Sequence, residues 1–349
     1  MKIAIAFITY NQSTFQYLPF FLPSLFRSIE ILKSQAEADF NISVLAVDNS
    51  DSANRDNYNY LISSLSEQRI DNKIWNSNEN LGFSKAYNIM LNFAIENDFD
   101  YFLMLNPDVL LKDDFLLELI DSSKKYLDFS VLAPRILYWD FVNNKKTDLI
   151  DSCGIGITKS NFFFDRGQGS KFEEKDYPAG EVFGFTGAGA LLNLKKLSLL
   201  AYQKNNYLEF FDEEMFMYKE DVEFSYRLQL AGLKIFFIPQ AIMYHHRSLS
   251  SRRNKILSLF FRKEDYKSRS RSLQNQLLIM YRIRKLPFSS KIRLFTAGRL
   301  FLLFMYSLFF RRRALFNFIK IKKQIEIKPP YLKDNIEGAL RIEKFMNTS

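Results

Sequence analysis

Three groups of residues in this sequence could do chemistry together. Glu220 and Asp221 are adjacent acids that follow the acidic, aromatic run FDEEMFMYK. Asp108 follows the apolar run YFLMLNP, and the only two histidines, His245 and His246, follow KIFFIPQAIMY. A carboxylate crowded among apolar groups has a raised pKa and can act as a general base, and carboxylates and imidazoles can hold a divalent cation that binds a diphosphate. The three groups therefore predict one catalytic site, assembled from distant segments.

Each of these residues also has a structural interpretation. Acids near a helix start complement the helix dipole, which alone could explain Glu220 and Asp221. Asp108 also precedes a predicted helix, although Asp113 and Asp114 lie closer to its start. A lone histidine is more often a structural hydrogen-bonding residue than a ligand. Because both histidines of this chain end the same predicted strand, we expect a metal or phosphate role for one of them.

The elements that position these residues are predicted by alternating strand-like and helix-like segments. In the first part of the chain, the predicted strands cover residues 3–10, 42–48, 73–75 and 101–108, and the predicted helices cover 16–36 and 83–97. This alternation is typical of an α/β protein with a mainly parallel sheet and helices on its faces. Such sheets bind ligands beyond the carboxyl ends of their strands.

Polar residues end three of these strands. Thr9 and Asn11 follow the first strand, Asp48 ends the second, and Asn106 and Asp108 end the fourth. They should lie on one rim of the sheet, where they would form a nucleotide site. Taken singly, each could instead be an ordinary strand-terminating or turn residue.

The second part of the domain repeats the pattern. Residues 138–177 contain hairpin or loop material, and the glycine-rich run VFGFTGAGALLNLKKL resumes the strand pattern. That run is no Walker-type phosphate loop, because it lacks the lysine and hydroxyl after the last glycine. A helix is expected at 220–231, stopped by Gly232, followed by a strand and its exit loop at 234–246.

Composition limits the classes of protein. A chain of 349 residues, 47% apolar and 25% charged, is long enough for one large folded domain with an appendage. The single cysteine, Cys153, excludes an intramolecular disulfide framework, and the polar residues in MKIAIAFITYN argue against a cleavable signal. We therefore expect a cytoplasmic protein.

The positive charge is concentrated at the C-terminal end. From Arg247 onward there are 25 Lys and Arg against 6 Asp and Glu, whereas residues 1–246 hold 23 against 33. A basic tail of this kind is typical of a partner for phosphates, either in nucleic acid or on an anionic membrane. We place the boundary between a catalytic domain and a basic helical region at 1–250 and 251–349.

The tail contains an apolar run, Leu300 to Phe310, between Arg299 and Arg311. As a helix it would span only about 16 Å, roughly half the core of a bilayer. We expect it to lie in the interface of an anionic membrane, with helical packing onto the catalytic domain as the alternative. Nucleic acid is not expected as a partner, because the aromatic residues are clustered in apolar blocks and no nucleic-acid-binding motif appears.

Taken in order, the segments resemble the family 2 glycosyltransferases of GT-A fold, in particular the rhamnosyltransferase-like branch that builds bacterial surface polysaccharides. The resemblance covers about residues 1–250. It is carried by ITYN, AVDNS, NENLGFSKAYN, LNPDV, FTGAGALL, FDEEMFMYKEDVEFSYRLQLAG, IFFIPQA and YHH. It implies a GT-A fold, a Rossmann-like mixed sheet flanked by helices.

The resemblance also implies roles for individual residues. Asp108 matches the last acid of the metal-binding DxD-type motif, shortened here to Asn106-Pro107-Asp108, and Asn106 would contact the donor sugar. With a single strict metal acid, His245 becomes the second ligand for Mg²⁺ or Mn²⁺. Asp221 matches the general base and Glu220 its acidic neighbour. Asp48 would contact the base of the nucleotide; the residues assigned to the nucleotide are Thr9, Asn11, Asp48, Asn80, Gly82 and Phe83.

The implied reaction is an inverting transfer of a sugar from a nucleotide diphosphate to a hydroxyl of a lipid-linked or growing cell-surface glycan. The resemblance favours dTDP-L-rhamnose as donor, with a UDP-hexose or UDP-galactofuranose as the alternative. An inactive relative retained as a binding subunit is disfavoured, because Asp108, Asp221 and His245 are all present. The implied location is the inner face of a bacterial cell membrane, with peripheral attachment.

Overall fold

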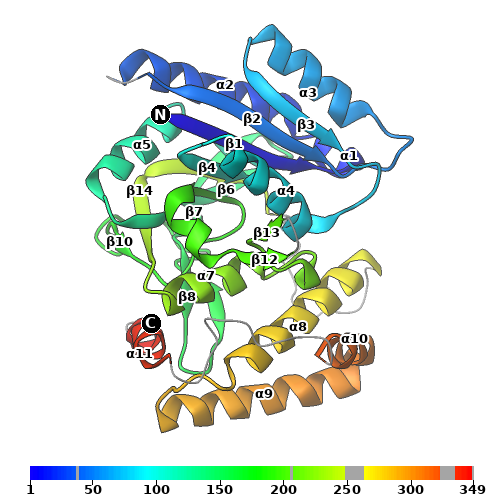
Figure 1. Cartoon of the computed structure of the whole chain (residues 1–349), viewed down its shortest axis with the longest axis vertical. Helices are drawn as coiled ribbons and strands as arrows, with labels where there is room; N and C mark the ends of the chain where they lie inside the picture. Colours follow the sequence, from blue (N-terminus) through cyan, green and yellow to red (C-terminus); the bar gives the residue numbers. More distant parts are fainter. Residues whose placement is uncertain (37–38, 205–206, 248–262, 323–334, 348–349) are drawn as a thin grey trace.

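The structure is a computed structural model that describes residues 1–36, 39–204, 207–247, 263–322 and 335–347. Its centre is a mixed sheet with the strand order β10-β14-β6-β11-β4-β1-β2-β3, in which β5 also pairs with β14 and β7 with β6 (Figure 1). The sheet contains β1 Lys2–Thr9, β2 Asn41–Asp48, β3 Asp71–Asn76, β4 Tyr101–Leu105, β5 Val109–Leu111, β6 Phe129–Asp140, β7 Lys145–Ser152, β10 Gly180–Glu181, β11 Gly189–Asn193 and β14 Lys234–His245.

The expected mainly parallel sheet is confirmed. Six of the ten described strands run in one direction, namely β1, β2, β3, β4, β6 and β14. Two described hairpins lie outside it, formed by β8 Ile155–Ile157 with β9 Phe163–Asp165 and by β12 Tyr202–Lys204 with β13 Tyr207–Glu209.

Helices cover both faces of the sheet. The described α-helices of the chain are α1 Asn11–Phe15, α2 Leu18–Gln35, α3 Asp56–Glu67, α4 Gly82–Glu96, α5 Phe115–Lys125, α6 Leu194–Leu197, α7 Glu220–Leu230, α8 Lys263–Ile283, α9 Ser290–Phe310, α10 Arg312–Lys322 and α11 Ile336–Asn347. Apolar side chains of α2, α3 and α5 pack on one face, and those of α4, α6 and α7 on the other. Because each of these six helices buries apolar side chains against the sheet, the strands between them are apolar on both faces.

The strand register brings polar residues to one edge. Thr9 is paired with Asp48, and Asp48 with Asn76, at the carboxyl ends of β1, β2 and β3. On the other side of β1, β4 ends at Leu105, directly before Asn106. The predicted helix at 16–36 is α2, which a short helix, α1, precedes.

The C-terminal helices lie together at one end of the molecule, away from α2 and α3 (Figure 1). Side chains of α8 and α11 share a buried core with α7 and the β8–β9 hairpin, including Ile279, Ile342 and Tyr226. The predicted domain boundary at residue 250 lies outside the described residues, so the division into 1–250 and 251–349 stays a prediction.

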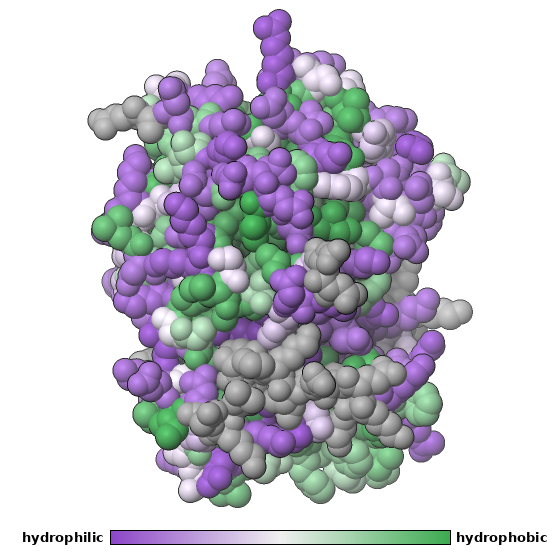
Figure 2. Space-filling view, viewed as in Figure 1, coloured by the Kyte–Doolittle hydropathy of each residue, from purple (hydrophilic) through white to green (hydrophobic). Residues whose placement is uncertain are grey.

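Helix α9 differs from the expectation for the apolar run. The run is 11 residues long, but the helix begins ten residues earlier, at Ser290, and has 21 residues. Among the described residues it is the one helix long and apolar enough to cross a membrane by length and composition. Most of its apolar side chains are exposed, with Leu302 and Phe310 each 68% exposed. Figure 2 shows apolar side chains along the lower rim of the molecule, where Figure 1 places α9.

Candidate active site

A cavity of about 380 Å³ opens at the carboxyl edge of the sheet. Eight of the eleven predicted site residues line it: Asn80, Gly82, Phe83, Asn106, Asp108, Glu220, Asp221 and His245. A larger hollow of about 840 Å³ lies between α2 and α3, but none of the predicted site residues lines it. We therefore take the smaller cavity as the candidate active site and call it the transfer cavity.

Asp221 lies in the first turn of α7 with its carboxylate held by two backbone donors. The N–H of Gly187 donates to its Oδ2 and the N–H of Val222 to its Oδ1, both at 2.8 Å. Burial raises the pKa of Asp221, while these two hydrogen bonds favour the ionised form. A Cβ at Gly187 would lie 3.1 Å from the ring of Phe83, so glycine lets the backbone approach both groups.

Glu220 has a different environment. Its side chain is buried, and its Oε2 has no hydrogen-bond partner among the described residues. Burial and the neighbouring Asp221 carboxylate raise the pKa of Glu220 to about 8. At neutral pH, Asp221 is therefore the acid of the pair that ionises first, as expected for a general base with an acidic neighbour.

The segment that leads into α7 has an unusual backbone. Phe216, Tyr218 and Lys219 all have positive φ angles, of 60°, 72° and 68°. Each such non-glycine residue costs of order 1–3 kcal/mol and persists only where its surroundings hold it. Asn275 of α8 supplies part of that support, because its Nδ2 donates to the carbonyls of Met215, Met217 and Tyr218 at 3.0, 3.0 and 2.7 Å.

Phe216 also explains the glycine of the NENLGF motif. Its carbonyl accepts from the N–H groups of Phe83 and Ser84, at 2.6 and 3.2 Å. Gly82 has φ +77°, and a Cβ there would lie 2.6 Å from the ring and carbonyl of Phe216. Only glycine fits this position, which fixes the start of α4 against the segment before α7.

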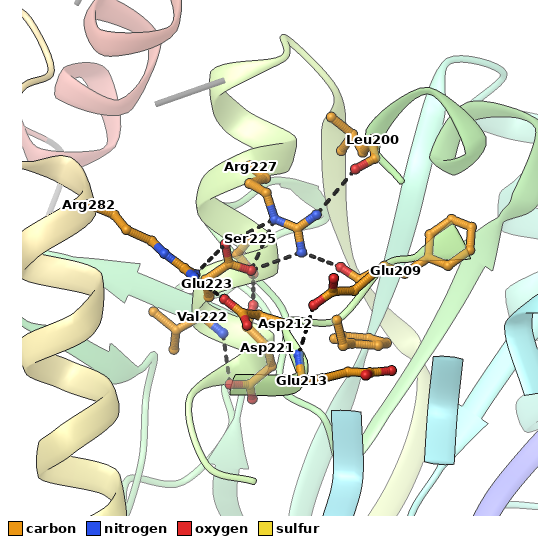
Figure 3. Close-up of polar contacts among 12 residues, drawn as sticks. Leu200, Glu209, Asp212, Glu213, Asp221, Val222, Glu223, Ser225, Arg227 and Arg282 are labelled. Atoms are coloured by element: carbon orange, nitrogen blue, oxygen red, sulfur yellow. Dashed lines mark hydrogen bonds and ion pairs between the residues drawn. The ribbon is translucent and has the colours of Figure 1, made fainter. Parts of the chain in front are cut away.

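Buried ion pairs also connect α7, α8 and the segment that leads into α7 (Figure 3). Arg227 and Glu223 form a bidentate pair one turn apart on α7, at 3.0 and 2.9 Å. Arg282 of α8 contacts Glu223 at 3.2 Å and pairs with Asp212, whose Oδ1 accepts from the N–H of Glu214. These contacts tie α8 to Asp212 at the start of the acidic run and to Glu223 on α7.

Asp108 and His245 lie together in the transfer cavity, as predicted. The Nε2 of His245 lies 3.4 Å from the Oδ2 of Asp108, and its Nδ1 lies 2.7 Å from the Oδ2 of Asp151. Burial lowers the pKa of His245, but Asp108 and Asp151 outweigh this and raise it to about 10. His246 is directed elsewhere, with its Nδ1 at 3.2 Å from the carbonyl of Trp139.

Two charged residues of the site were not predicted. Asp151 is the last but one residue of β7, in the part of the chain expected to be hairpin or loop, and it is 1% exposed. Arg247 lines the transfer cavity and contacts Asp151 at 3.1 Å and Asp165 at 2.9 Å. Arg247 directly follows His246, so its position at the end of the strand could have predicted a place in the site. No feature of the sequence predicts that Asp151 pairs with His245.

Three predicted nucleotide-binding residues, Thr9, Asn11 and Asp48, are not among the residues that line the cavity. Thr9 and Asp48 are fully buried, and the hydroxyl of Thr9 donates to Asp48 at 2.9 Å. The Oδ2 of Asp48 has no partner among the described residues. Asn11 has φ 43° and exchanges hydrogen bonds with Asp51. Their contacts with a nucleotide stay a prediction.

The donors present suit a divalent cation bound in part by the substrate. No cluster of three or more His, Cys, Asp or Glu side chains that could hold a metal occurs in the described part of the chain. Asp108 and His245 offer two ligands on one side of the cavity, 3.4 Å apart. Asp151 holds the other ring nitrogen of His245, which is the usual support for a metal-binding histidine.

The family models that match this sequence, and a similar curated protein, are all glycosyltransferases. The model of "Glycosyl transferase family 2" matches residues 5–198, and that of "Glycosyl transferase family group 2" matches residues 141–321. The rhamnosyltransferase WbbL of Escherichia coli (strain K12) is 28% identical over 188 residues, which is 47% of this chain and 61% of WbbL. The chain thus matches less than two thirds of that relative's length.

One solved structure of known fold supports the architecture. S. aureus TarS superposes with a TM-score of 0.50 at 14% identity, over 99% of this chain and 50% of TarS. The mannosyltransferase PcManGT from Pyrobaculum calidifontis, determined with GDP-Man and Mn²⁺, gives a TM-score of 0.48 at 12% identity, over 99% of this chain and 86% of PcManGT. The likeness to TarS concerns the fold alone and agrees with the expected GT-A architecture, which is confirmed. Each of the two family models covers more than half of the 349 residues, and the chain belongs to glycosyl transferase family 2.

Proposed function

We propose that this protein is an inverting glycosyltransferase that moves a sugar from a nucleotide diphosphate to a hydroxyl of a glycan acceptor. The observation that carries the proposal is the content of the transfer cavity. Asp221, a carboxylate that accepts two backbone hydrogen bonds, shares this cavity with the Asp108–His245 pair. A base and a diphosphate site in one cavity are the two requirements of a direct displacement at the anomeric carbon.

The chemical step follows from these positions. Asp221 accepts the proton of the acceptor hydroxyl as the hydroxyl oxygen bonds to the anomeric carbon. The bond between that carbon and the diphosphate oxygen breaks, and the electron pair leaves with the nucleoside diphosphate. A single displacement inverts the configuration of the anomeric carbon. Glu220, protonated at neutral pH, does not compete for this proton.

Asp108 and His245 would hold Mg²⁺ or Mn²⁺, with phosphate oxygens and water as the remaining ligands. When bound there, the ion offsets the charge that develops on the leaving diphosphate. The imidazole must give up its Nε2 proton to bind a metal, and Asp151 keeps the ring oriented through Nδ1.

The similarity to a rhamnosyltransferase supports dTDP-L-rhamnose as the donor. A UDP-hexose or UDP-galactofuranose is the alternative, because no described contact selects a sugar or a base. Asp48, with Thr9 and Asn11, would lie beside the base. Around the rest of the donor we assign the cavity residues Asn80, Gly82, Phe83 and Asn106.

The proposed acceptor is a lipid-linked or growing surface polysaccharide at the inner face of a bacterial membrane. The exposed apolar side of α9 supports this location, together with exposed cations such as Lys291, Arg293 and Arg312. No acidic residue occurs in α9 or α10. A buried hydrogen bond of 2.6 Å from Asn161 to Thr296 ties α9 to the β8–β9 connection, which favours a helix lying on the membrane over one crossing it.

A panel of nucleotide sugars tests the proposal. The purified protein is heated with each donor, with and without Mn²⁺, and donor turnover is measured in parallel. We expect one donor to raise the melting temperature in the presence of Mn²⁺, because a ligand at 100 times its Kd stabilises by about 2.7 kcal/mol. A protein that neither binds nor turns over any donor in the panel would contradict the proposal.

A further inference from the structure

A second cavity, of about 370 Å³, lies next to the transfer cavity. It is bounded by α8, by α10 and by the segment Phe216–Tyr218. We call it the basic cavity, because Lys267, Arg271 and Arg313 line it and none of its lining residues is acidic. It shares two residues, Met217 and Tyr218, with the transfer cavity.

Helical spacing turns its polar groups to one side. On α8, Lys267, Arg271 and Gln274 follow at intervals of four and three residues, and on α10 Arg313 and Asn317 are four apart. Residues at these intervals lie on one face of a helix. The two faces meet across the cavity, so five side chains with N–H donors converge there.

The cations have no anionic partner among the residues that the structure describes. The guanidinium of Arg271 lies 4.2 Å from the ring centroid of Phe216, and burial lowers the pKa of Arg271. Ser270, which is buried and also lines the cavity, has a hydroxyl without a described partner. Uncompensated guanidinium groups and a free hydroxyl are complementary to phosphate oxygens.

Apolar surface continues from the mouth of this cavity. Phe316, three residues after Arg313 and therefore its neighbour on α10, is 70% exposed. The preceding helix, α9, ends just before α10 with the exposed residues Phe309 and Phe310. On its other side, the shared wall ends at Tyr218, two residues before Glu220 and three before Asp221. The basic cavity thus lies between an exposed apolar surface and the proposed base.

We propose that the basic cavity binds the phosphate of an acceptor that is a phosphate or diphosphate ester of a long apolar alcohol. The apolar chain would lie on α9 and α10, and the sugar attached to the phosphate would extend past Tyr218 toward Asp221. This inference rests on the proposed function and assigns Lys267, Arg271 and Arg313 to the phosphate of its acceptor.

Binding of farnesyl diphosphate, measured by calorimetry without any donor, tests the inference. Arg271→Gln and Arg313→Gln should each weaken binding about tenfold or more, the usual effect of losing a charged contact to phosphate. Lys320→Gln removes an exposed cation of the same helix, α10, outside the cavity, and should leave binding unchanged. Arg313 is exposed, so its variant is not expected to disturb folding, and a melting curve checks this.

Two further measurements distinguish a lipid phosphate from free phosphate, and the basic cavity from the transfer cavity. Inorganic pyrophosphate should bind more weakly than farnesyl diphosphate; equal affinity would mean a site for free phosphate and would overturn the acceptor assignment. Asp108→Ala should lower binding of a nucleoside diphosphate but not of farnesyl diphosphate. Loss of farnesyl diphosphate binding in Asp108→Ala, or unchanged binding in both cavity variants, would also overturn the inference. Because transfer is not measured, its failure is distinct from failure of the proposed function.

Discussion

Glu220 and Asp221 are sequence neighbours with opposite surroundings. The Asp221 carboxylate accepts two backbone hydrogen bonds in a half-buried position, whereas Glu220 is buried with one oxygen unpartnered. Two acids so close cannot both ionise easily, and hydrogen bonding decides which one does. The structure thereby gives different surroundings to two acids that the sequence alone presents as a pair, and Asp221 is the one suited to act as the proposed base.

Asp221→Asn should abolish transfer while leaving donor binding intact. Asparagine has the size of aspartate but cannot take a proton, so we expect the rate to fall by about 10²- to 10⁴-fold. Asp108→Ala should instead weaken both donor binding and transfer. Single-turnover rates and donor titrations distinguish the two variants, and normal turnover by Asp221→Asn would refute the assignment of the base.

Glu220 should make folding stability depend on pH. In the folded protein its pKa is about 8, against an ordinary value of 4.5, so the folded state binds more protons between these pH values. Stability is therefore lost as pH rises from about 4.5 to about 8. Glu220→Gln cannot ionise and should gain of order 1–3 kcal/mol over wild type between pH 5 and pH 8.

Denaturant unfolding at the two pH values measures this difference. The exposed neighbour Glu214 provides a matched control, because Glu214→Gln removes a carboxylate from the same segment without uncovering a buried site. A gain by Glu220→Gln that is the same at both pH values would show that Glu220 does not titrate in this range.

At the scale of elements, α8 supports the segment that leads into α7. Asn275→Ala removes three hydrogen bonds to carbonyls of residues 215–218, which lie next to positive-φ residues. We expect a loss of stability of about 1–3 kcal/mol and a fall in kcat larger than the change in KM for the donor, because Asp221 would lose its orientation.

Asn335 offers a control, because it contacts the opposite end of α7 from the segment that Asn275 supports. Its Nδ2 donates to the carbonyl of Leu230 at 3.0 Å, at the C-terminal end of α7. Asn335→Ala should reduce the melting temperature as well, but leave kcat near the wild-type value. Equal kcat losses in the two variants would mean that Asn275 acts through general stability alone.

The elements were predictable where local pattern and burial agree. Residues of β1, β2, β4 and β14 form apolar runs, and the core-facing positions of α7 recur at helical spacing. Helix α3 was not predicted, because its sequence DNYNYLISSLSE buries little apolar surface besides Leu61 and Leu65.

Asp151 and Asn275 were missed for another reason. Their roles depend on partners 94 and about 60 residues away, which no local pattern encodes.

At the scale of the whole molecule, the basic helices should hold the protein to an anionic surface. Replacing the exposed residues Leu302 and Phe309 by Asp should weaken co-sedimentation with phosphatidylglycerol liposomes at least about tenfold, because two side chains lose burial in lipid and two negative charges are added. Leu127→Asp, at an even more exposed position on the catalytic part, should have no effect.

The same co-sedimentation experiment is repeated at rising salt and with DNA in place of liposomes. Rising salt should weaken lipid binding only in part, because the apolar contribution is not screened. Co-sedimentation with DNA, measured with the same variants, gives the competing result. Binding to DNA and not to liposomes would assign the positive charge of the C-terminal region to nucleic acid.

The two histidines at the end of β14 are not equivalent, and the strand decides which of them reaches the site. Successive side chains of a strand point to opposite faces, so His245 meets Asp108 and Asp151 while His246 turns toward Trp139. A deletion of one residue after the bulge at 238–242 would bring His246 to the place of His245, and an insertion would put a residue other than histidine there. Homologous proteins should therefore tolerate changes of residue type in this stretch far more readily than changes of its length.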